Sequence, residues 1–255
     1  MAYNSPQHYS APPPNYEEEA RQPLFQSEEE NDDMYKTTVA NSSIEIRLQF
    51  VRKVYSILTA QIFGTVIMSA FYLYNSNAKH FVQTNPWLLY TSMFGSFGVL
   101  LLLMWKARSA PLNYVLLGIF TLLESQLVGT VVTFYDQTIV LQALVITAGV
   151  FFGLTIFTLQ SKWDFSGMGP ILYAGIWVLL LAGIVQIFIP FSKGIELAMA
   201  IGGVVIFSGY IIFDTFLIFN RYSPEDYIMA STSLYMDIIN LFLRILQILN
   251  AMQRD

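Results

Sequence analysis

Long apolar segments alternate with short polar connectors from residue 54 to the end of the chain. Each apolar segment has about 20 residues, the length that an α-helix needs to cross roughly 30 Å of hydrocarbon. Because backbone groups in lipid must be satisfied within the protein, we expect these segments to be helices. The pattern predicts an all-α polytopic membrane protein, with a seven-transmembrane-helix bundle over residues 44–255. The predicted spans are 54–74, 86–105, 112–133, 139–159, 170–190, 197–219 and 228–249.

Lys and Arg residues near the segment ends predict the orientation of the bundle. Seven of them fall on the side of the N-terminus and three on the opposite side. This bias favours a cytosolic N-terminus. The last segment is the most polar, because it contains Asp237, Asn240 and Arg244, and a re-entrant loop is the alternative for it.

The first 43 residues differ in composition from the rest of the chain. They are rich in Pro, Ser, Asn, Gln and Glu and predict a disordered tail, because they cannot bury enough apolar surface to offset the ordering entropy. Residues 1–45 carry a net charge of −7 within a total of −5 for the chain. The acidic balance therefore belongs to the tail and says nothing about a substrate of the membrane domain.

The tail contains Pro13, Pro14 and Tyr16 in the PPxY pattern that WW domains bind. Prolines preset the polyproline II conformation, so little entropy is lost when an aromatic groove grips the segment. A WW-domain ubiquitin ligase is the expected partner. A chance match in a Pro-rich tail is the alternative.

Composition also excludes several kinds of site. The chain has no cysteine, and its two histidines, His8 and His80, lie in the tail and in a connector. Disulfides, thiolate catalysis, histidine triads and zinc sites are therefore not expected. No basic patch with interleaved aromatic residues is present, so nucleic acid is not an expected partner. We expect no cofactor.

Two aspartates, Asp214 and Asp237, interrupt the last two predicted spans. A carboxylate at bilayer depth costs roughly 2.5–3.5 kcal/mol on insertion scales, so such residues are usually functional. They lie roughly 9 and 13.5 Å from the cytosolic ends of their spans, at about 1.5 Å of rise per residue. Because the two spans form an antiparallel hairpin, we hypothesise that the carboxyl groups approach each other.

Two carboxyl groups close together in a dry site cannot both ionise at low cost, and they titrate as a coupled pair. The pair is thus a candidate pH sensor in an ion pathway, and its oxygens suit transient calcium. Tyr210, one turn from Asp214, is positioned to donate a hydrogen bond to it. The alternative is a structural clasp between helices, in which Arg244 neutralises Asp237. Asn240 and Arg244 share a helix face with Asp237.

Glu124 is a further ionisable residue inside a span, in the stretch LLESQLVGT. It is either a second acidic site of the pathway or a hydrogen-bonded contact between helices. The residues alone leave both interpretations open.

Five consecutive stretches give the chain its resemblance to a known family. They are FVRKVYSILTAQ (50–61), PLNYVLLGIFTLLESQLVGTVVTFYD (111–136), VFFGLTIFTLQSKWDFSGMG (150–169), SGYIIFDT (208–215) and SPEDYIMASTSLYMDIINLFLRIL (223–246). In these stretches, which cover nearly all of residues 44–252, the sequence resembles the transmembrane Bax-inhibitor-motif family, and within it the lifeguard branch.

The resemblance implies a calcium leak channel of intracellular membranes that modulates calcium homeostasis, programmed cell death and the unfolded protein response. It places a pH-sensing dyad on Asp214 and Asp237. In bacterial relatives a basic residue near the cytosolic end of the second helix latches onto the dyad, and Lys106 and Arg108 are the candidates for this gate latch here. It implies the endoplasmic reticulum as location, with vacuole, Golgi or mitochondrion as alternatives, and cell-death regulators as partners. No role is implied for Arg244.

Two other classes of function compete with the leak channel. A non-conducting membrane scaffold would act on cell death through protein partners, and the PPxY motif favours it. An intramembrane aspartyl protease would also place two aspartates on neighbouring helices. Its second aspartate normally follows the pattern GxGD, whereas Asp237 follows LYM. We therefore expect no enzymatic activity.

Overall fold

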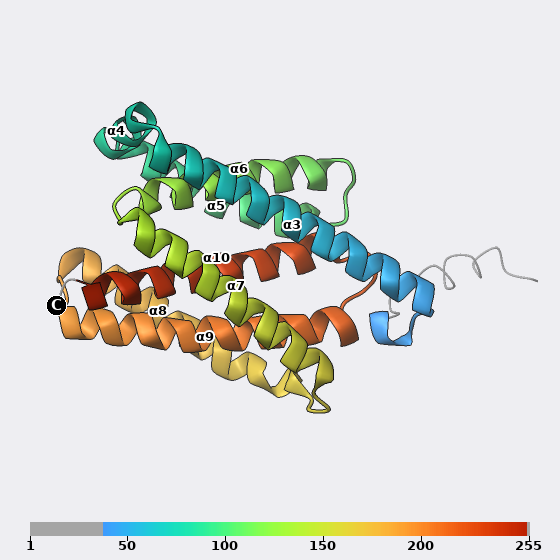
Figure 1. Cartoon of the computed structure of the whole chain (residues 1–255). Coiled ribbons are helices and arrows are strands. Elements are labelled where there is room, and N and C mark those ends of the chain that lie inside the picture. Colours follow the sequence, from blue (N-terminus) through green and yellow to red (C-terminus); the bar gives the residue numbers. More distant parts are fainter. Residues whose placement is uncertain (1–37, 254–255) are drawn as a thin grey trace, which may run out of the picture. The chain divides into compact units, whose positions relative to one another are not determined.

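A computed structural model of the chain describes residues 38–253, which are almost entirely helical. Within this described part, seven helices are long and apolar enough to cross a membrane, which confirms the predicted all-α, seven-helix architecture (Figure 1). They are α3 (Ile44–Tyr74), α5 (Trp87–Lys106), α6 (Leu112–Val132), α7 (Gln137–Gln160), α8 (Gly169–Phe188), α9 (Lys193–Asn220) and α10 (Tyr227–Gln253). The short elements are η1 (Val39–Asn41), α4 (Ser76–Thr84) and η2 (Phe165–Met168).

Polar side chains mark where several helices begin. The Ser43 hydroxyl accepts a hydrogen bond from the Ile46 N–H at the start of α3, and the Asn75 side chain does the same for the first turn of α4. Asp136 accepts from the Thr138 N–H at the start of α7. These bonds satisfy amide groups that have no partner within the helix. The hydrogen bonds from Thr138 also hold the pKa of the Asp136 carboxyl below its usual range.

Helix α10 lies at the centre of the bundle, where it packs against α3, α6, α7 and α9. Half of its most apolar stretch is buried inside the protein, compared with 11% for the segment that contains α8. This stretch is also less apolar than the corresponding stretch of each of the other six helices. A helix surrounded by protein tolerates polar residues that a lipid-facing helix does not. The last segment is therefore one unbroken helix, and its polarity reflects its central position rather than a re-entrant loop.

The folded part begins before the predicted first span. Helix α3 starts at Ile44, and the η1 turn ahead of it buries Val39 completely. The Val39 N–H donates a 2.8 Å hydrogen bond to the carbonyl of Tyr222, in the connection between α9 and α10. The contacts of Val39 thus lie ahead of the predicted first span, where a hydropathy pattern cannot detect a turn that docks onto a distant loop. The PPxY motif lies outside the described residues.

Candidate functional site

The paired aspartates occupy matching positions on α9 and α10. On α9, Phe207, Ile211, Asp214 and Ile218 are buried at the spacing of one helix face. On α10 the same spacing is formed by the buried residues Ala230, Leu234, Asp237 and Leu241. Each aspartate therefore occupies one position in an otherwise apolar row of buried residues, and α9 and α10 pack against each other.

The two carboxyl groups are close enough to share a side-chain hydrogen bond. Asp214 and Asp237 are each only 7% exposed. The structure thus brings together the two residues that the hairpin argument placed near each other. Two carboxyl groups in contact form one titrating unit, because the charge state of each changes the cost of ionising the other.

Two tyrosines lie near the aspartate pair. Tyr210 on α9 and Tyr222 after α9 both experience the charge of Asp214 and Asp237. Burial, followed by the charge of Asp214, raises the pKa of Tyr222, so its phenol stays neutral and can donate a hydrogen bond. Tyr210 donates no hydrogen bond to Asp214 within residues 38–253, which differs from the predicted contact.

A polar atom of the pair is left without a protein partner. Asp237 Oδ2 is buried and has no hydrogen-bond partner among residues 38–253, and the same holds for Thr215 Oγ1 beside Asp214 on α9. Buried polar groups are normally satisfied, so each exception requires an explanation. An unpartnered carboxylate oxygen is a site for a proton or for a passing cation.

No basic residue neutralises the pair in the described part of the chain. Arg244 lies two turns beyond Asp237, roughly 10.5 Å along the helix axis, and its Nη1 donates to Gln247 Oε1 at 3.1 Å. Asn240 donates to the Met236 carbonyl at 2.8 Å, within its own helix. The clasp in which Arg244 neutralises Asp237 is therefore wrong for this structure, because sharing a helix face did not bring the two groups within reach.

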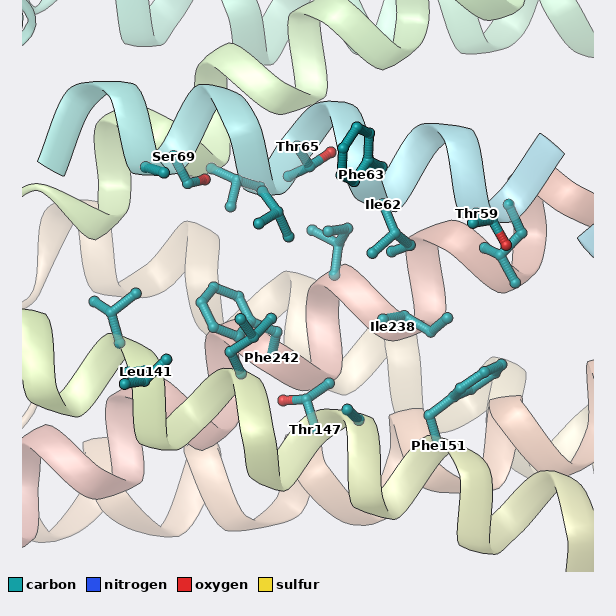
Figure 2. Close-up of a pocket in the computed structure, with 18 of the residues that line it drawn as sticks. Thr59, Ile62, Phe63, Thr65, Ser69, Leu141, Thr147, Phe151, Ile238 and Phe242 are labelled. Atoms are coloured by element: carbon teal, nitrogen blue, oxygen red, sulfur yellow. The ribbon is translucent and has the colours of Figure 1, made fainter. Parts of the chain in front are cut away.

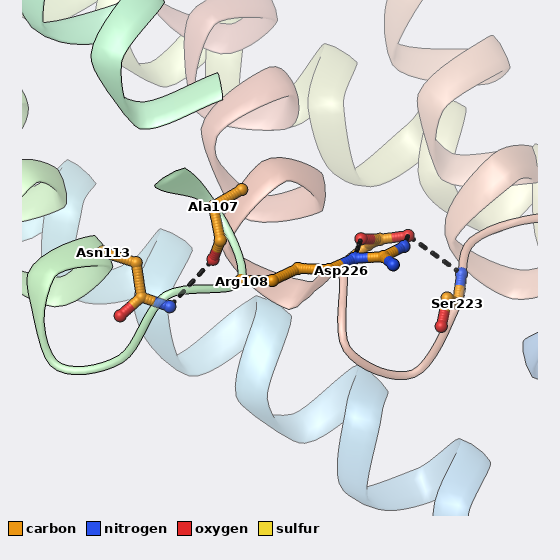
Figure 3. Close-up of polar contacts among 5 residues, drawn as sticks. All are labelled: Ala107, Arg108, Asn113, Ser223 and Asp226. Atoms are coloured by element: carbon orange, nitrogen blue, oxygen red, sulfur yellow. Dashed lines mark hydrogen bonds and ion pairs between the residues drawn. The ribbon is translucent and has the colours of Figure 1, made fainter. Parts of the chain in front are cut away.

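Arg108 forms a latch at a different place from the predicted one. Its Nε and Nη2 donate to the two carboxylate oxygens of Asp226 at 2.8 and 3.0 Å (Figure 3). Asp226 also accepts from the Ser223 N–H at 3.4 Å. Lys106 instead lies over the ring of its neighbour Trp105, 4.4 Å from the centroid. The Arg108 contact ties the α5–α6 connection to the α9–α10 connection and does not reach the aspartate pair.

A double-mutant cycle of Arg108→Ala and Asp226→Ala is expected to give a coupling free energy of about 0.5–1 kcal/mol. The bidentate geometry favours the contact, but the Arg108 side chain is 49% exposed, so water and salt screen it. The coupling should fall as the salt concentration rises. The Arg221–Asp164 pair, at 3.8 Å and more exposed, should couple less and serves as the control. Equal coupling in both pairs would contradict this interpretation.

Glu124 lies in a polar layer on the other side of α10. It is buried on α6 and bonds to the Ser96 side chain on α5, with Tyr235 of α10 nearby. The Tyr235 hydroxyl lies 2.8 Å from Thr65 Oγ1, which is 3.0 Å from Ser125 Oγ. Tyr235 precedes Asp237 by two positions, roughly 200° around the helix. Glu124 thus joins an interhelical hydrogen-bonded layer separate from the aspartate pair.

Thr65 and Tyr235 are members of this layer that the sequence pattern did not predict, whereas Ser125 directly follows Glu124 in the predicted span. Thr and Ser are common in membrane helices, and their hydroxyls often bond within their own helix. Tyr235 offered a signal, because a tyrosine in the middle of a span needs a partner for its hydroxyl.

A cavity of about 520 Å³ lies between α3 and α7, with α10 at its base (Figure 2). Ile62 of α3, Phe151 of α7 and Phe242 of α10 are typical of its lining, and no Asp, Glu, Lys, Arg or His of residues 38–253 contributes to it. Its polar side-chain groups are hydroxyls, such as those of Thr59 and Thr147, and the amide of Gln137. The cavity suits an apolar occupant and does not offer a path for an ion.

Comparison with known proteins identifies the family. The profile described as "Inhibitor of apoptosis-promoting Bax1" matches residues 47–255. The chain is 46% identical to "Protein lifeguard 4" of Mus musculus, over 88% of this chain and 94% of that protein. It is 45% identical to "Bax inhibitor 1" of Schizosaccharomyces pombe, over 88% of this chain and 85% of that protein. It is 43% identical to the "Golgi anti-apoptotic protein" of Vaccinia virus strain Lister, over 87% of this chain and 93% of that protein. The chain therefore belongs to the Bax inhibitor family, which includes the lifeguard proteins.

Proposed function

We propose that the protein is a pH-sensitive calcium leak pathway of an intracellular membrane and that it acts in the regulation of cell death. The observation that carries the proposal is the buried contact between Asp214 and Asp237. Within residues 38–253, Asp237 Oδ2 has no hydrogen-bond partner and no basic residue pairs with either carboxyl group. If the two aspartates only held the helices together, we would expect every buried oxygen of the pair to have a hydrogen-bond partner.

Protonation of the pair supplies the pH sensitivity. With a shared proton the two carboxyl groups can hold α9 and α10 together. When both are ionised, two like charges in a site with little water repel each other. Repulsion at this contact favours separation of the two helices, and separation opens a path lined by carboxylate oxygens.

Calcium is the proposed permeant ion because hard oxygen ligands are those it prefers. Calcium sites normally supply about six to eight oxygens. No group of three or more His, Asp or Glu side chains is placed to hold a metal ion within residues 38–253. Two carboxylates with few further ligands bind weakly, which suits an ion that passes rather than one that is stored.

The names of the relatives support the cellular part of the proposal. Those of the fission yeast and viral proteins refer to Bax inhibition and to an anti-apoptotic protein of the Golgi. We propose that this chain restrains programmed cell death and influences the unfolded protein response through calcium release from the endoplasmic reticulum. A WW-domain ubiquitin ligase remains a proposed partner for the PPxY motif, and cell-death regulators are proposed partners for the membrane domain.

Calcium efflux from liposomes that contain the purified full chain tests this function. Liposomes loaded with calcium are stepped between acidic and neutral pH, and protein-free liposomes of the same lipid are the control. We expect efflux above the control that changes with pH. Efflux equal to the control at every pH, from protein shown to be folded, would overturn the leak pathway and favour the non-conducting scaffold.

A further inference from the structure

A second, polar cavity of about 310 Å³ lies at the end of the bundle opposite to Val39. Four parts of the chain form it: the connection between α6 and α7, the end of α8, the beginning of α9 and the end of α10. Its polar lining residues are Tyr135, Gln186, Lys193, Glu196, Arg244, Gln247 and Asn250. The aspartate pair is not among its lining residues, so this cavity is separate from the site described above.

The aliphatic part of the Arg244 side chain packs against α9 in the wall of the cavity. The side chain packs against the backbone of Gly203 on α9, where a Cβ atom would lie 2.8 Å from Arg244 Cδ. Any residue larger than glycine would therefore displace the arginine. The close fit orients the guanidinium group, and an oriented fork of N–H donors loses little entropy when it binds an oxyanion.

Most N–H donors of the Arg244 guanidinium have no acceptor in the described part of the chain. Its one hydrogen bond in the described part of the chain goes from Nη1 to Gln247 Oε1 at 3.1 Å. Arginine offers several N–H donors and no acceptor, and a half-buried arginine normally pairs with a carboxylate. No carboxylate of residues 38–253 forms an ion pair with Arg244.

Glu196, the acidic residue in the lining of the cavity, already accepts a hydrogen bond from a neighbouring side chain. Glu196 Oε1 accepts a 2.9 Å hydrogen bond from Gln186 Nε2. Lys193 and Arg244 thus give the cavity an excess of positive charge over Glu196. Ser192, at the start of α9, forms no side-chain cap in the described part of the chain, so the first amide groups of this helix add donors beside Lys193.

From these contacts we infer that the cavity binds a phosphate group. A phosphate offers several oxygens to a guanidinium fork, an ammonium group and amide donors at once. Because the cavity lies at the ends of membrane-spanning helices, the phosphate can come from a lipid headgroup or from a soluble anion. The inference does not depend on calcium passage through the aspartate pair.

Phosphorus NMR titration of the full chain in maltoside micelles, which contain no phosphate, tests the site. One arm uses inorganic phosphate and the other uses short-chain phosphatidate. We expect saturable line broadening with wild-type protein. Arg244→Gln and Lys193→Gln should each weaken binding about tenfold or more, because a hydrogen bond to a charged group is worth about 1.5–3 kcal/mol. Saturation by phosphatidate alone identifies a lipid headgroup, and saturation by both probes identifies the phosphate group itself.

Lys79→Gln is the matched control, because Lys79 lies on α4 at the same end of the bundle and outside the cavity. It should bind like the wild type. Lys193 is exposed at the first residue of α9, so Lys193→Gln remains informative if Arg244→Gln fails to fold. Failure of both probes to saturate wild-type protein would overturn the inference. The same applies if Lys193→Gln and Lys79→Gln bind alike.

Discussion

A chain that carries both Asp214→Asn and Asp237→Asn is expected to pass calcium at a rate that no longer changes with pH. Asparagine keeps the shape of aspartate but neither gains nor loses a proton between acidic and neutral pH. The repulsion that ionisation creates between α9 and α10 is therefore absent at every pH. The ratio of the rates at neutral and acidic pH should fall to about one, because the titrating pair has been removed.

The control for this experiment is Glu45→Gln, which removes an exposed carboxylate from the first turn of α3. It changes the net charge by one without touching the aspartate pair, so its pH response should equal that of the wild type. A double Asp→Asn variant that keeps the wild-type response would contradict the assignment of the sensor.

Tyr235→Ala is expected to lower the free energy of unfolding by about 3–5 kcal/mol, the usual cost of truncating a buried aromatic residue. Tyr235 is fully buried at the centre of the bundle. Its ring meets the edge of Phe120, with centroids 6.1 Å apart, and its hydroxyl bonds to Thr65. The change leaves a cavity between α6 and α10 and removes a hydrogen bond to α3. Unfolding in mixed detergent micelles measures the loss.

Tyr235→Phe separates the two parts of this effect. It keeps the ring and removes only the hydroxyl, so the loss should be about 1 kcal/mol. Thr65 retains the Ser125 hydroxyl and the Gln61 carbonyl as partners, which limits the cost. Tyr90→Ala, at an exposed position of α5, is the control for loss of an aromatic ring. A loss for Tyr235→Ala no larger than that for Tyr90→Ala would contradict the central position of α10.

The course of the chain through the membrane was predictable from sequence because it depends on length and polarity alone. Seven apolar helices were predicted and seven are present in residues 38–253, and both aspartates lie in the interior of their helices. The hairpin of α9 and α10 follows from the short connection between them. With the depths of Asp214 and Asp237 known, their proximity was a reasonable hypothesis.

The partners of long charged side chains were not predictable, and the errors follow from this. Arg244 shares a face with Asp237, yet its side chain contacts Gln247, further along α10, and Gly203 on α9. Arg108 pairs with Asp226, whose position in a connector gave no hint of a partner so distant in sequence. Long flexible side chains at helix ends have many possible partners, and only the packed structure selects among them.

If Asp214 and Asp237 act as one titrating unit, each of the single variants Asp214→Asn and Asp237→Asn should change the pH response of the other aspartate. The measurement is the pH midpoint of calcium efflux for each single variant beside the wild type. Because each carboxyl group sets the ionisation cost of the other, the account predicts that the midpoint moves in both single variants. A single variant that retains the wild-type midpoint and response would show that the two aspartates titrate independently, and would contradict the account.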